Sequence, residues 1–342
     1  MYSVSIQFRV KVSKSKKKAM KNATLKKSCR VSFVAYANKE IEHMWNKESY
    51  STSRNYRTAL HSFLRYREGK DIMFNEFDSD LIDDYNRWLR HNNICPNTIS
   101  CYMRSLRAIY NKAVKVHIVR QTYPFSDVFT GIAKTDKRSI TIADISRLQQ
   151  LDLKRGSFKE FVRDLFLFSF FALGMPFIDL AFLRKSQIVG ENIVYYRHKT
   201  GQKVTIRLEP CMSDIICRYN VPGSEFVFPL LTKMNTKASE SIYNCYKSRI
   251  CYYNKILNGL GKEAGIPSQL TSYVARHTWA TVAYQKQVDL PIISKALGHT
   301  NTKTTQIYVK ELNNDKLNKV NRKIIAQLFP LYKSCTRKGF YK

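Results

Sequence analysis

One stretch of the chain, residues 120–140, interrupts a helical pattern and so restricts the fold to two successive units. Before it, residues 31–119 repeat apolar side chains at the spacing of amphipathic helices. The stretch itself contains Pro124, Gly131 and a run of charged residues, a composition typical of a linker. A second unit is predicted at residues 141–332, and a chain of 342 residues has room for both.

Each end of the chain carries a short basic segment outside these two units. Residues 1–30 contain ten Lys or Arg and no acidic residue, and residues 333–342 form a basic tail. Within the first segment, Tyr2–Val12 alternates enough to predict a short strand, and the remainder is typical of a flexible arm. Such an arm either adds contacts to phosphate groups or is a solvated tail, and the sequence leaves both interpretations open.

The first unit is predicted to be a helical bundle with basic side chains on its outer faces. Helices are predicted at Ser53–Arg67, at Ser79–Arg90 with Ser79 as N-cap, and at Asn97–Lys115. Basic residues lie opposite the apolar faces of the first and third helices, and we predict that they contact DNA: Arg54, Arg57, Arg104, Arg107 and Lys115. On a single helix such charges more often form a solvated face, but two basic helices in one bundle favour DNA.

The second unit is predicted to be mainly helical with one small sheet. It begins with a helix that Thr141-Ile-Ala-Asp144 would cap, and a long apolar helix follows at 159–173. Two strands are predicted at 193–197 and 204–208, with the hairpin turn Lys199-Thr-Gly-Gln202 between them. After the second strand the pattern returns to helices.

The charge of the chain favours a polyanionic partner. The sequence has 58 Lys and Arg against 26 Asp and Glu, a formal net charge of +32. Because such a chain neutralises phosphate groups and releases their counterions, nucleic acid is the favoured partner. A merely basic soluble protein remains the alternative.

Other classes of protein are disfavoured by composition. The eight cysteines include no CxxC pair, so no zinc site is predicted, and the thiols are typical of a reducing compartment. The most apolar run, Leu165–Ile178, is 14 residues long, whereas a membrane span needs about 20. No signal peptide is recognised. We therefore expect a soluble, cytoplasmic, nucleoid-associated protein without a membrane partner.

Three side chains in the last third of the chain can converge on one phosphate group. Arg276 lies in the run Tyr-Val-Ala-Arg-His-Thr-Trp-Ala-Thr, His299 follows Leu-Gly, and Tyr308 ends Thr-Thr-Gln-Ile-Tyr. Arginine can grip two phosphate oxygens, a loop histidine can point at a ligand, and tyrosine can act as a nucleophile. Lys199, at the hairpin turn, can donate a proton to a leaving oxygen. Each residue alone is better explained as structural, and only the combination indicates a site.

These motifs resemble the tyrosine recombinase (integrase) family, and most closely its branch of mobile-element integrases and DNA invertases. The resemblance covers roughly residues 31–330 and is most specific around Arg276 and from Leu297 to Tyr308. Asn97–Tyr110 is similar to the family's core-binding helices, and Gly174–Leu180 is similar to its first catalytic box.

The resemblance implies a mainly α fold, with a helical-bundle core-binding domain at 31–119 and an α+β catalytic domain at 141–332 forming a C-shaped DNA clamp. It also implies double-stranded DNA recombination sites as partners, a homo-tetramer assembled on DNA, and room for an accessory DNA-bending protein. A C-terminal helix at Asn313–Tyr332 would dock either on a neighbouring protomer or within its own chain.

The chemistry implied by the resemblance requires no metal and no nucleotide cofactor. Tyr308 would attack a scissile phosphate, form a 3′-phosphotyrosyl link and release a 5′-hydroxyl. Arg276 and His299 would hold and neutralise the phosphate, and Lys199 would be the general acid for the leaving oxygen. A 5′-hydroxyl of another strand would then reverse the reaction and exchange the strands.

The sequence departs from the family pattern at two positions. The first catalytic box usually has an arginine two residues after its glycine, where this chain has Pro176, although Asp179 matches the acidic position of the box. We predict that Arg197 replaces the missing arginine, because it lies two residues before Lys199 on the same predicted strand. The alternative is that Arg197 only contacts the DNA backbone or solvent. The position three before Arg276 is usually histidine or lysine, and here Tyr273 could hydrogen-bond the phosphate but is a poor base near pH 7.

The sequence supports a site-specific recombinase that integrates and excises a mobile element or inverts a DNA segment. A catalytically weak DNA-binding relative is the alternative, because of the two altered positions. A relaxing topoisomerase would use similar chemistry, but the core-binding segment resembles integrases more.

Overall fold

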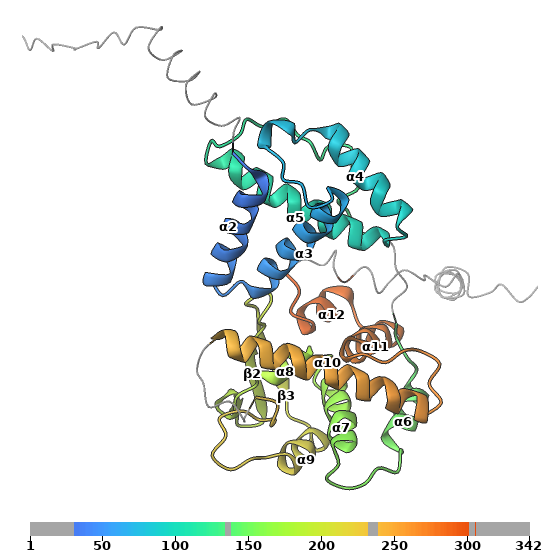
Figure 1. Cartoon of the computed structure of the whole chain (residues 1–342). Coiled ribbons are helices and arrows are strands. Elements are labelled where there is room, and N and C mark those ends of the chain that lie inside the picture. Colours follow the sequence, from blue (N-terminus) through green and yellow to red (C-terminus); the bar gives the residue numbers. More distant parts are fainter. Residues whose placement is uncertain (1–30, 134–137, 232–238, 301–304, 306–342) are drawn as a thin grey trace, which may run out of the picture. The chain divides into compact units, whose positions relative to one another are not determined.

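The computed structural model describes residues 31–133, 138–231, 239–300 and 305. These residues form two compact units, unit 1 within residues 1–135 and unit 2 within residues 136–342 (Figure 1). The described part of the chain is mainly helical with one small antiparallel sheet, which confirms the predicted fold class. The predicted strand at Tyr2–Val12, the basic tail and the predicted helix at Asn313–Tyr332 lie outside the described residues.

Unit 1 is a bundle of helices joined by short turns (Figure 1): α2 (Phe33–Asn46), α3 (Tyr50–Tyr66), the 3₁₀ turn η1 (Phe74–Glu76), α4 (Ser79–His91) and α5 (Pro96–Lys115). Helix α3 packs against both α2 and α5. The helices predicted in this region correspond to α3, α4 and α5 with slightly shifted ends. The N-cap of α4 is Asp78 and not Ser79, because the Asp78 carboxylate accepts a 2.9 Å hydrogen bond from the Leu81 amide.

Aromatic side chains fill the core of unit 1. Phe33, Phe63 and Phe77 are buried and pack ring against ring, with centroids 4.4 to 6.2 Å apart. Tyr85 is also buried, and its hydroxyl donates to Ser62 Oγ at 2.8 Å, so its polar group is satisfied. Burial of each such ring contributes about 2 kcal/mol, so tertiary packing rather than helix propensity holds the bundle together.

The stretch predicted as a linker, 120–140, is folded into the units over most of its length. Phe125 and Val128 are buried in the core of unit 1. The Asn97 side chain binds both backbone groups of Ala133, donating at 3.1 Å and accepting at 2.8 Å. Ile140 is already part of the core of unit 2. The predicted linker was too long, because the prediction followed the Pro, Gly and charged residues of the stretch and did not identify Phe125, Val128 and Ile140 as core residues.

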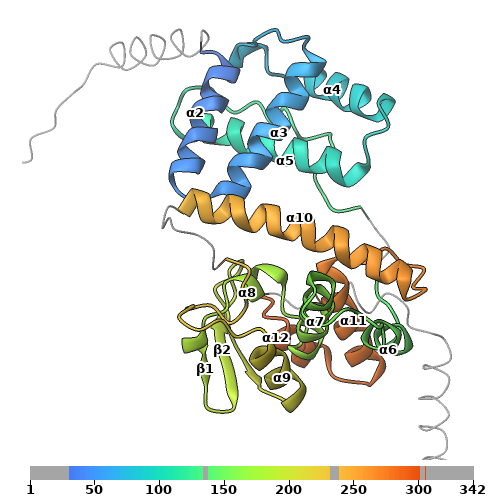
Figure 2. The same cartoon turned by 60° about the horizontal axis from the view of Figure 1, so that its bottom comes forward.

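Unit 2 combines helices with a three-stranded sheet (Figures 1 and 2): α6 (Ile142–Gln149), α7 (Phe158–Phe171), α8 (Phe177–Ala181), η2 (Lys185–Gln187), β1 (Ile188–Val189), β2 (Asn192–Tyr196), β3 (Lys203–Arg207), α9 (Pro210–Arg218), α10 (Ser239–Glu263), α11 (Ser272–Gln285) and α12 (Leu290–Ala296). The sheet is antiparallel in the order β1-β2-β3. The predicted cap of α6 is confirmed, because Thr141 accepts from the Asp144 amide and Asp144 accepts from the Thr141 amide.

Helix α7 is the centre of unit 2. It contacts α6, α9, α10 and α11, and most of its side chains are buried. Figure 2 shows the long helix α10 on one side of this group. Among the described residues no helix has both the length and the apolar content that crossing a bilayer requires.

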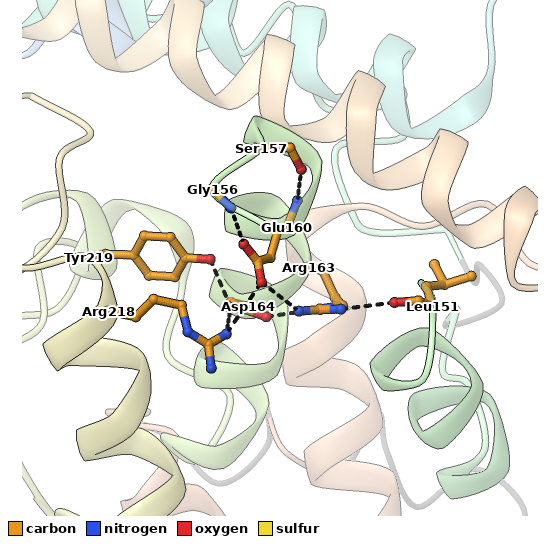
Figure 3. A network of polar contacts seen from close by, with 8 residues as sticks. All are labelled: Leu151, Gly156, Ser157, Glu160, Arg163, Asp164, Arg218 and Tyr219. Carbon is orange, nitrogen blue, oxygen red and sulfur yellow. Dashed lines mark hydrogen bonds and ion pairs between the residues drawn. The ribbon is translucent and has the colours of Figure 1, made fainter. Parts of the chain in front are cut away.

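A network of paired charges fixes α7 to α9 and to the segment before α7 (Figure 3). Asp164 accepts from Arg218 Nη1 at 2.5 Å and from the Tyr219 hydroxyl at 2.8 Å. Arg163 bonds Asp164 at 2.9 Å and donates to the Leu151 carbonyl at 3.1 Å, and Glu160 accepts from the Gly156 amide at 2.7 Å. Two carboxylates face two guanidinium groups, so the network balances its charge and we assign it a structural role.

Candidate active site

Arg276 is a buried charged residue of unit 2, at 2% exposure. It projects from the second turn of α11, and its guanidinium donates to two backbone carbonyls from distant segments. Nη1 bonds Gly174 O at 3.0 Å, and Nη2 bonds Leu297 O at 2.5 Å. These contacts fix the orientation of the guanidinium before any ligand arrives.

Gly174 allows the segment after α7 to approach α11 closely. Its φ is +71°, and a Cβ at this position would lie 2.7 Å from the Arg276 Cα. No other residue fits without moving backbone. The first catalytic box thus contributes its glycine to the placement of Arg276, while Pro176, where the family has an arginine, serves as the N-cap of α8.

Arg197 reaches the same point from the β2–β3 hairpin. It is 6% exposed, its Nε lies 2.7 Å from Asp179 Oδ2, and its Nη1 donates to Leu297 O. The carbonyl oxygen of Leu297 therefore accepts from both Arg197 and Arg276. Two guanidinium groups that are far apart in the sequence meet at one backbone oxygen, and each is anchored by the protein's own acceptors.

The position of Arg197 differs from the prediction in one respect. Strand β2 ends at Tyr196, so Arg197 is the first residue of the loop and does not share a strand with Lys199. It is directed inward by Asp179 of α8, whose carboxylate also accepts from the backbone amide of His198 at 3.0 Å. The acidic residue of the first catalytic box, and not the pleat of a strand, positions Arg197.

Gly298 follows α12 and packs against the β2–β3 hairpin. Its φ is +61°, and a Cβ there would lie 2.9 Å from Arg197 Cγ and 3.1 Å from Val204 Cγ2. Its carbonyl accepts from Thr200 Oγ1 of the hairpin at 3.1 Å. The glycine thus gives the chain a left-handed turn after the helix and lets the hairpin pack against it.

His299 lies next to both arginines. Its Nε2 is 3.0 Å from Arg276 Nη2, and its Nδ1 is 2.9 Å from Thr305 Oγ1. Burial and the positive charges of Arg276, Arg197 and Lys199 lower its pKa from 6.5 to about 4. His299 is therefore neutral at pH 7 in this positively charged site.

Of the remaining residues predicted for catalysis, two are exposed and one is not described by the structure. Lys199 is exposed in the hairpin turn, and its charge acts on His299. Tyr273 is 48% exposed on the first turn of α11, where its ring lies 4.9 Å from that of His277. Tyr308, the predicted nucleophile, lies outside the described residues. The structure thus brings Arg197, Arg276 and His299 together and places Lys199 and Tyr273 at exposed positions, and the catalytic roles of all six residues stay predictions.

The residues predicted to bind DNA in unit 1 lie on α3 and α5. Arg54, Arg57, Arg104 and Lys115 are exposed. Arg57 stacks over the Trp45 ring at 5.6 Å, and Arg104 Nε donates to its own helix at Ser100 O. Arg107 is half-buried and donates to Thr130 Oγ1 at 3.1 Å. Arg107 therefore already has a structural partner within unit 1.

Sequence reasoning missed three residues around the candidate site: His198, Thr200 and Thr305. All three are small or polar side chains beside residues that were singled out, but no spacing rule indicates that they bond across the fold. Residues that could hold a metal ion do not cluster anywhere in the described part of the chain. The donors at the site are guanidinium groups, a lysine and a histidine, a set that suits a phosphate group.

Two family models match the chain in succession. The model described as Phage integrase SAM-like domain matches residues 32–128, and the model described as Phage integrase family matches residues 172–315. The first match lies in unit 1 and the second in unit 2.

Tyrosine recombinases are among the similar proteins. XerD of Oceanobacillus iheyensis is 23% identical over 286 residues, which cover 80% of this chain and 93% of that protein. XerH of Campylobacter jejuni is 42% identical over a shorter stretch of 67 residues, 19% of each protein.

Solved integrase structures share the fold. A lambda integrase dimer bound to a COC′ core site matches with a TM-score of 0.59 at 14% identity, over 81% of this chain and 95% of that one. The Tn1549 transposon integrase in complex with transposon right end DNA matches with a TM-score of 0.61 at 15% identity, over 86% and 100%. With both family models matched in order and the same fold, the chain belongs to the tyrosine recombinase, or phage integrase, family of DNA breaking-and-rejoining enzymes.

Proposed function

We propose that this protein is an active site-specific recombinase that cuts and rejoins double-stranded DNA through a 3′-phosphotyrosyl intermediate. The observation that carries the proposal is the meeting of Arg197, Arg276 and His299 around the Leu297 carbonyl. A phosphate next to this cluster would meet two fixed guanidinium groups, which stabilise the extra negative charge of a pentacoordinate transition state.

In this proposal Arg197 replaces the arginine that the first catalytic box lacks. Support comes from its burial, from its ion pair with Asp179 of that box, and from the acceptor that it shares with Arg276. Asp179 neutralises part of the charge of Arg197 and holds Nε, Leu297 O accepts from Nη1, and Nη2 would be the group that meets the phosphate. The second phosphate-binding arginine thus comes from the hairpin rather than from the start of α8.

The other roles follow from the chemistry. Tyr308 attacks the phosphate and becomes linked to the 3′ side, and Lys199, exposed on the hairpin, protonates the 5′-oxygen that leaves. Tyr273 donates a hydrogen bond to the phosphate. Arg54, Arg57, Arg104, Arg107 and Lys115 contact the DNA backbone from unit 1. No step needs a metal or a nucleotide cofactor, because the phosphodiester bond energy is kept in the phosphotyrosyl link.

We further propose that the reaction serves integration and excision of a mobile element or inversion of a DNA segment, and that four copies assemble on two DNA sites. One of the solved structures with this fold is a lambda integrase tetramer bound to a Holliday junction, which supports such an assembly. An accessory DNA-bending protein would assist by bringing the sites together. We assign this work to the core-binding bundle, whose core includes Phe125 and Val128, to the catalytic domain, whose core includes Ile140, and to the basic ends of the chain.

A catalytically weak DNA-binding relative is the second candidate. Pro176 at the position of the first-box arginine and the half-exposed Tyr273 in place of histidine favour it.

A suicide DNA substrate separates the two candidates: it is nicked close to the cleavage site, so that the short fragment carrying the released 5′-hydroxyl diffuses away after cleavage. The substrate is drawn from the repeats or element ends that flank the gene. An active recombinase gives a covalent protein–DNA adduct that Tyr308→Phe abolishes while DNA binding persists. Binding with no adduct in the wild-type protein would refute the enzyme and support the second candidate.

A further inference from the structure

The His299 ring has one partner for each nitrogen, and the nature of the partners fixes its protons. Arg276 Nη2, 3.0 Å from Nε2, is a donor only, so Nε2 must accept. In the neutral ring Nδ1 then carries the hydrogen and donates it to Thr305 Oγ1 at 2.9 Å. The tautomer is therefore assigned from the partners: hydrogen on Nδ1, lone pair on Nε2.

Thr305 is well placed to enforce this tautomer. It is 0% exposed, so water does not compete for its hydroxyl, and its oxygen can accept from Nδ1 whatever the state of Nε2. It also lies only three positions before Tyr308 in the sequence. The hydrogen bond therefore joins His299 to a residue that lies close to the proposed nucleophile in the sequence.

This tautomer determines what Nε2 of His299, the nitrogen beside Arg276, can do. With Nδ1 occupied by Thr305, only Nε2 can gain or lose a proton, and Nε2 lies beside Arg276. A bound phosphate would bring negative charge to this point and favour the imidazolium form, whose Nε2–H then donates to a phosphate oxygen. The charged groups that act on the ring in the free protein are Arg276, Arg197 and Lys199, all positive.

We propose that Thr305 is a positioning residue for DNA cleavage: its hydroxyl oxygen keeps a proton on Nδ1 of His299 and so reserves Nε2 for the scissile phosphate. The inference rests on the proposed function for its catalytic consequence, but its geometric half concerns the free protein. The two halves can therefore be tested separately.

Two substitutions of similar size separate hydrogen bonding from packing. Thr305→Val keeps the shape and removes the acceptor, whereas Thr305→Ser keeps the acceptor and removes a methyl group. If Thr305 positions His299, Thr305→Val lowers the single-turnover rate of adduct formation about 10- to 100-fold, and Thr305→Ser stays within a few-fold of wild type. If Thr305 only fills space, the order of the two variants is reversed, which would overturn the proposal.

Two further measurements exclude an indirect effect. In a His299→Ala background, Thr305→Val should cause no additional loss, because a residue that acts through the ring has nothing left to position. The pH–rate profile of Thr305→Val should also shift at its acidic side, which a packing defect would not produce. An equal loss in both backgrounds with an unchanged profile would contradict the inference.

Nitrogen NMR of the free protein tests the tautomer without any activity. Wild type and Thr305→Ser should show His299 protonated on Nδ1 and unprotonated on Nε2 at pH 7, whereas Thr305→Val should show a mixture. The same tautomer in all three proteins would refute the role of Thr305, even if the recombinase is active. Conversely, absence of any adduct from the wild-type protein would refute the proposed function and leave this spectroscopic test intact.

Discussion

Three of the arginines predicted to bind DNA in unit 1 and the two arginines of the candidate site in unit 2 differ in burial and anchoring. Arg54, Arg57 and Arg104 stand on helix surfaces that face solvent, whereas Arg197 and Arg276 are 6% and 2% exposed and held by backbone carbonyls. An exposed arginine supplies charge that a neighbour can replace. A buried one supplies donors at fixed positions, so its surroundings tolerate little change. Burial and anchoring, rather than charge alone, therefore distinguish candidate catalytic arginines in a very basic chain.

The largest effect is expected at Arg276. Arg276→Lys keeps the charge but loses the fork that reaches Gly174 O and Leu297 O, so we expect adduct formation to fall about 1,000-fold. The single-turnover assay on the suicide substrate measures this. Arg104→Lys is the matched control on an exposed helix face and should change little. Comparable rates for the two lysine variants would show that burial of Arg276 does not matter for cleavage.

Arg197→Ala is expected to lower cleavage about 100- to 1,000-fold while leaving DNA affinity nearly intact. The reason is that Arg197 contributes donors at one phosphate and little to the wider binding surface. Cleavage and gel-shift binding measured on the same preparation decide this. Cleavage at the wild-type rate would mean that Arg197 does not replace the missing first-box arginine.

Gly298→Ala should lower cleavage about tenfold and destabilise unit 2 by about 1–3 kcal/mol, because the new methyl group meets Arg197 Cγ at 2.9 Å and the backbone has φ of +61°. Gly190→Ala provides the control, since Gly190 has φ of +57° but open space around its Cβ. The control carries the backbone strain without the clash. If both variants lose the same stability and activity, contact with Arg197 is not important.

Acid should weaken unit 2 through His299. Its pKa is about 4 when folded and about 6.5 when unfolded, so below pH 6.5 the unfolded chain binds more protons, and stability falls until about pH 4. Thermal unfolding at pH 7.5 and pH 5 should therefore show a larger loss of Tm in wild type than in His299→Gln. An equal loss in the two proteins would mean that the ring is not held neutral.

The smallest effect is expected on α3 of unit 1. Arg54→Ala should weaken DNA binding about threefold to tenfold, lower the slope of log affinity against log salt by about 1, and leave the cleavage rate at saturating protein unchanged. Binding titrations at several salt concentrations measure this. A change in the rate of bound complexes would place this arginine closer to the chemistry than its exposure indicates.

Much of the fold follows from local patterns. The apolar spacing of α3, α4, α5 and α7, the capping residues Thr141 and Asp144, and the turn between β2 and β3 are all visible in the sequence, because each depends on residues within a few positions. The linker was misjudged for the same reason. Phe125 and Val128 can be identified as core residues only from the three-dimensional structure, because their contacts are with distant parts of unit 1.

For the candidate site, the sequence by itself supplied the motifs around Arg276 and His299, the position of Lys199 and the absence of an arginine at 176. The three-dimensional structure was needed to find that Arg197 and Arg276 meet at Leu297 O, that Asp179 holds Arg197, and that Thr305 contacts His299. The physical reason is that a motif records neighbours along the chain, whereas a phosphate site needs donors that converge in space from helices, a hairpin and a loop. Such convergence is set by packing, including two glycines that admit the arginines, and packing has no local signature.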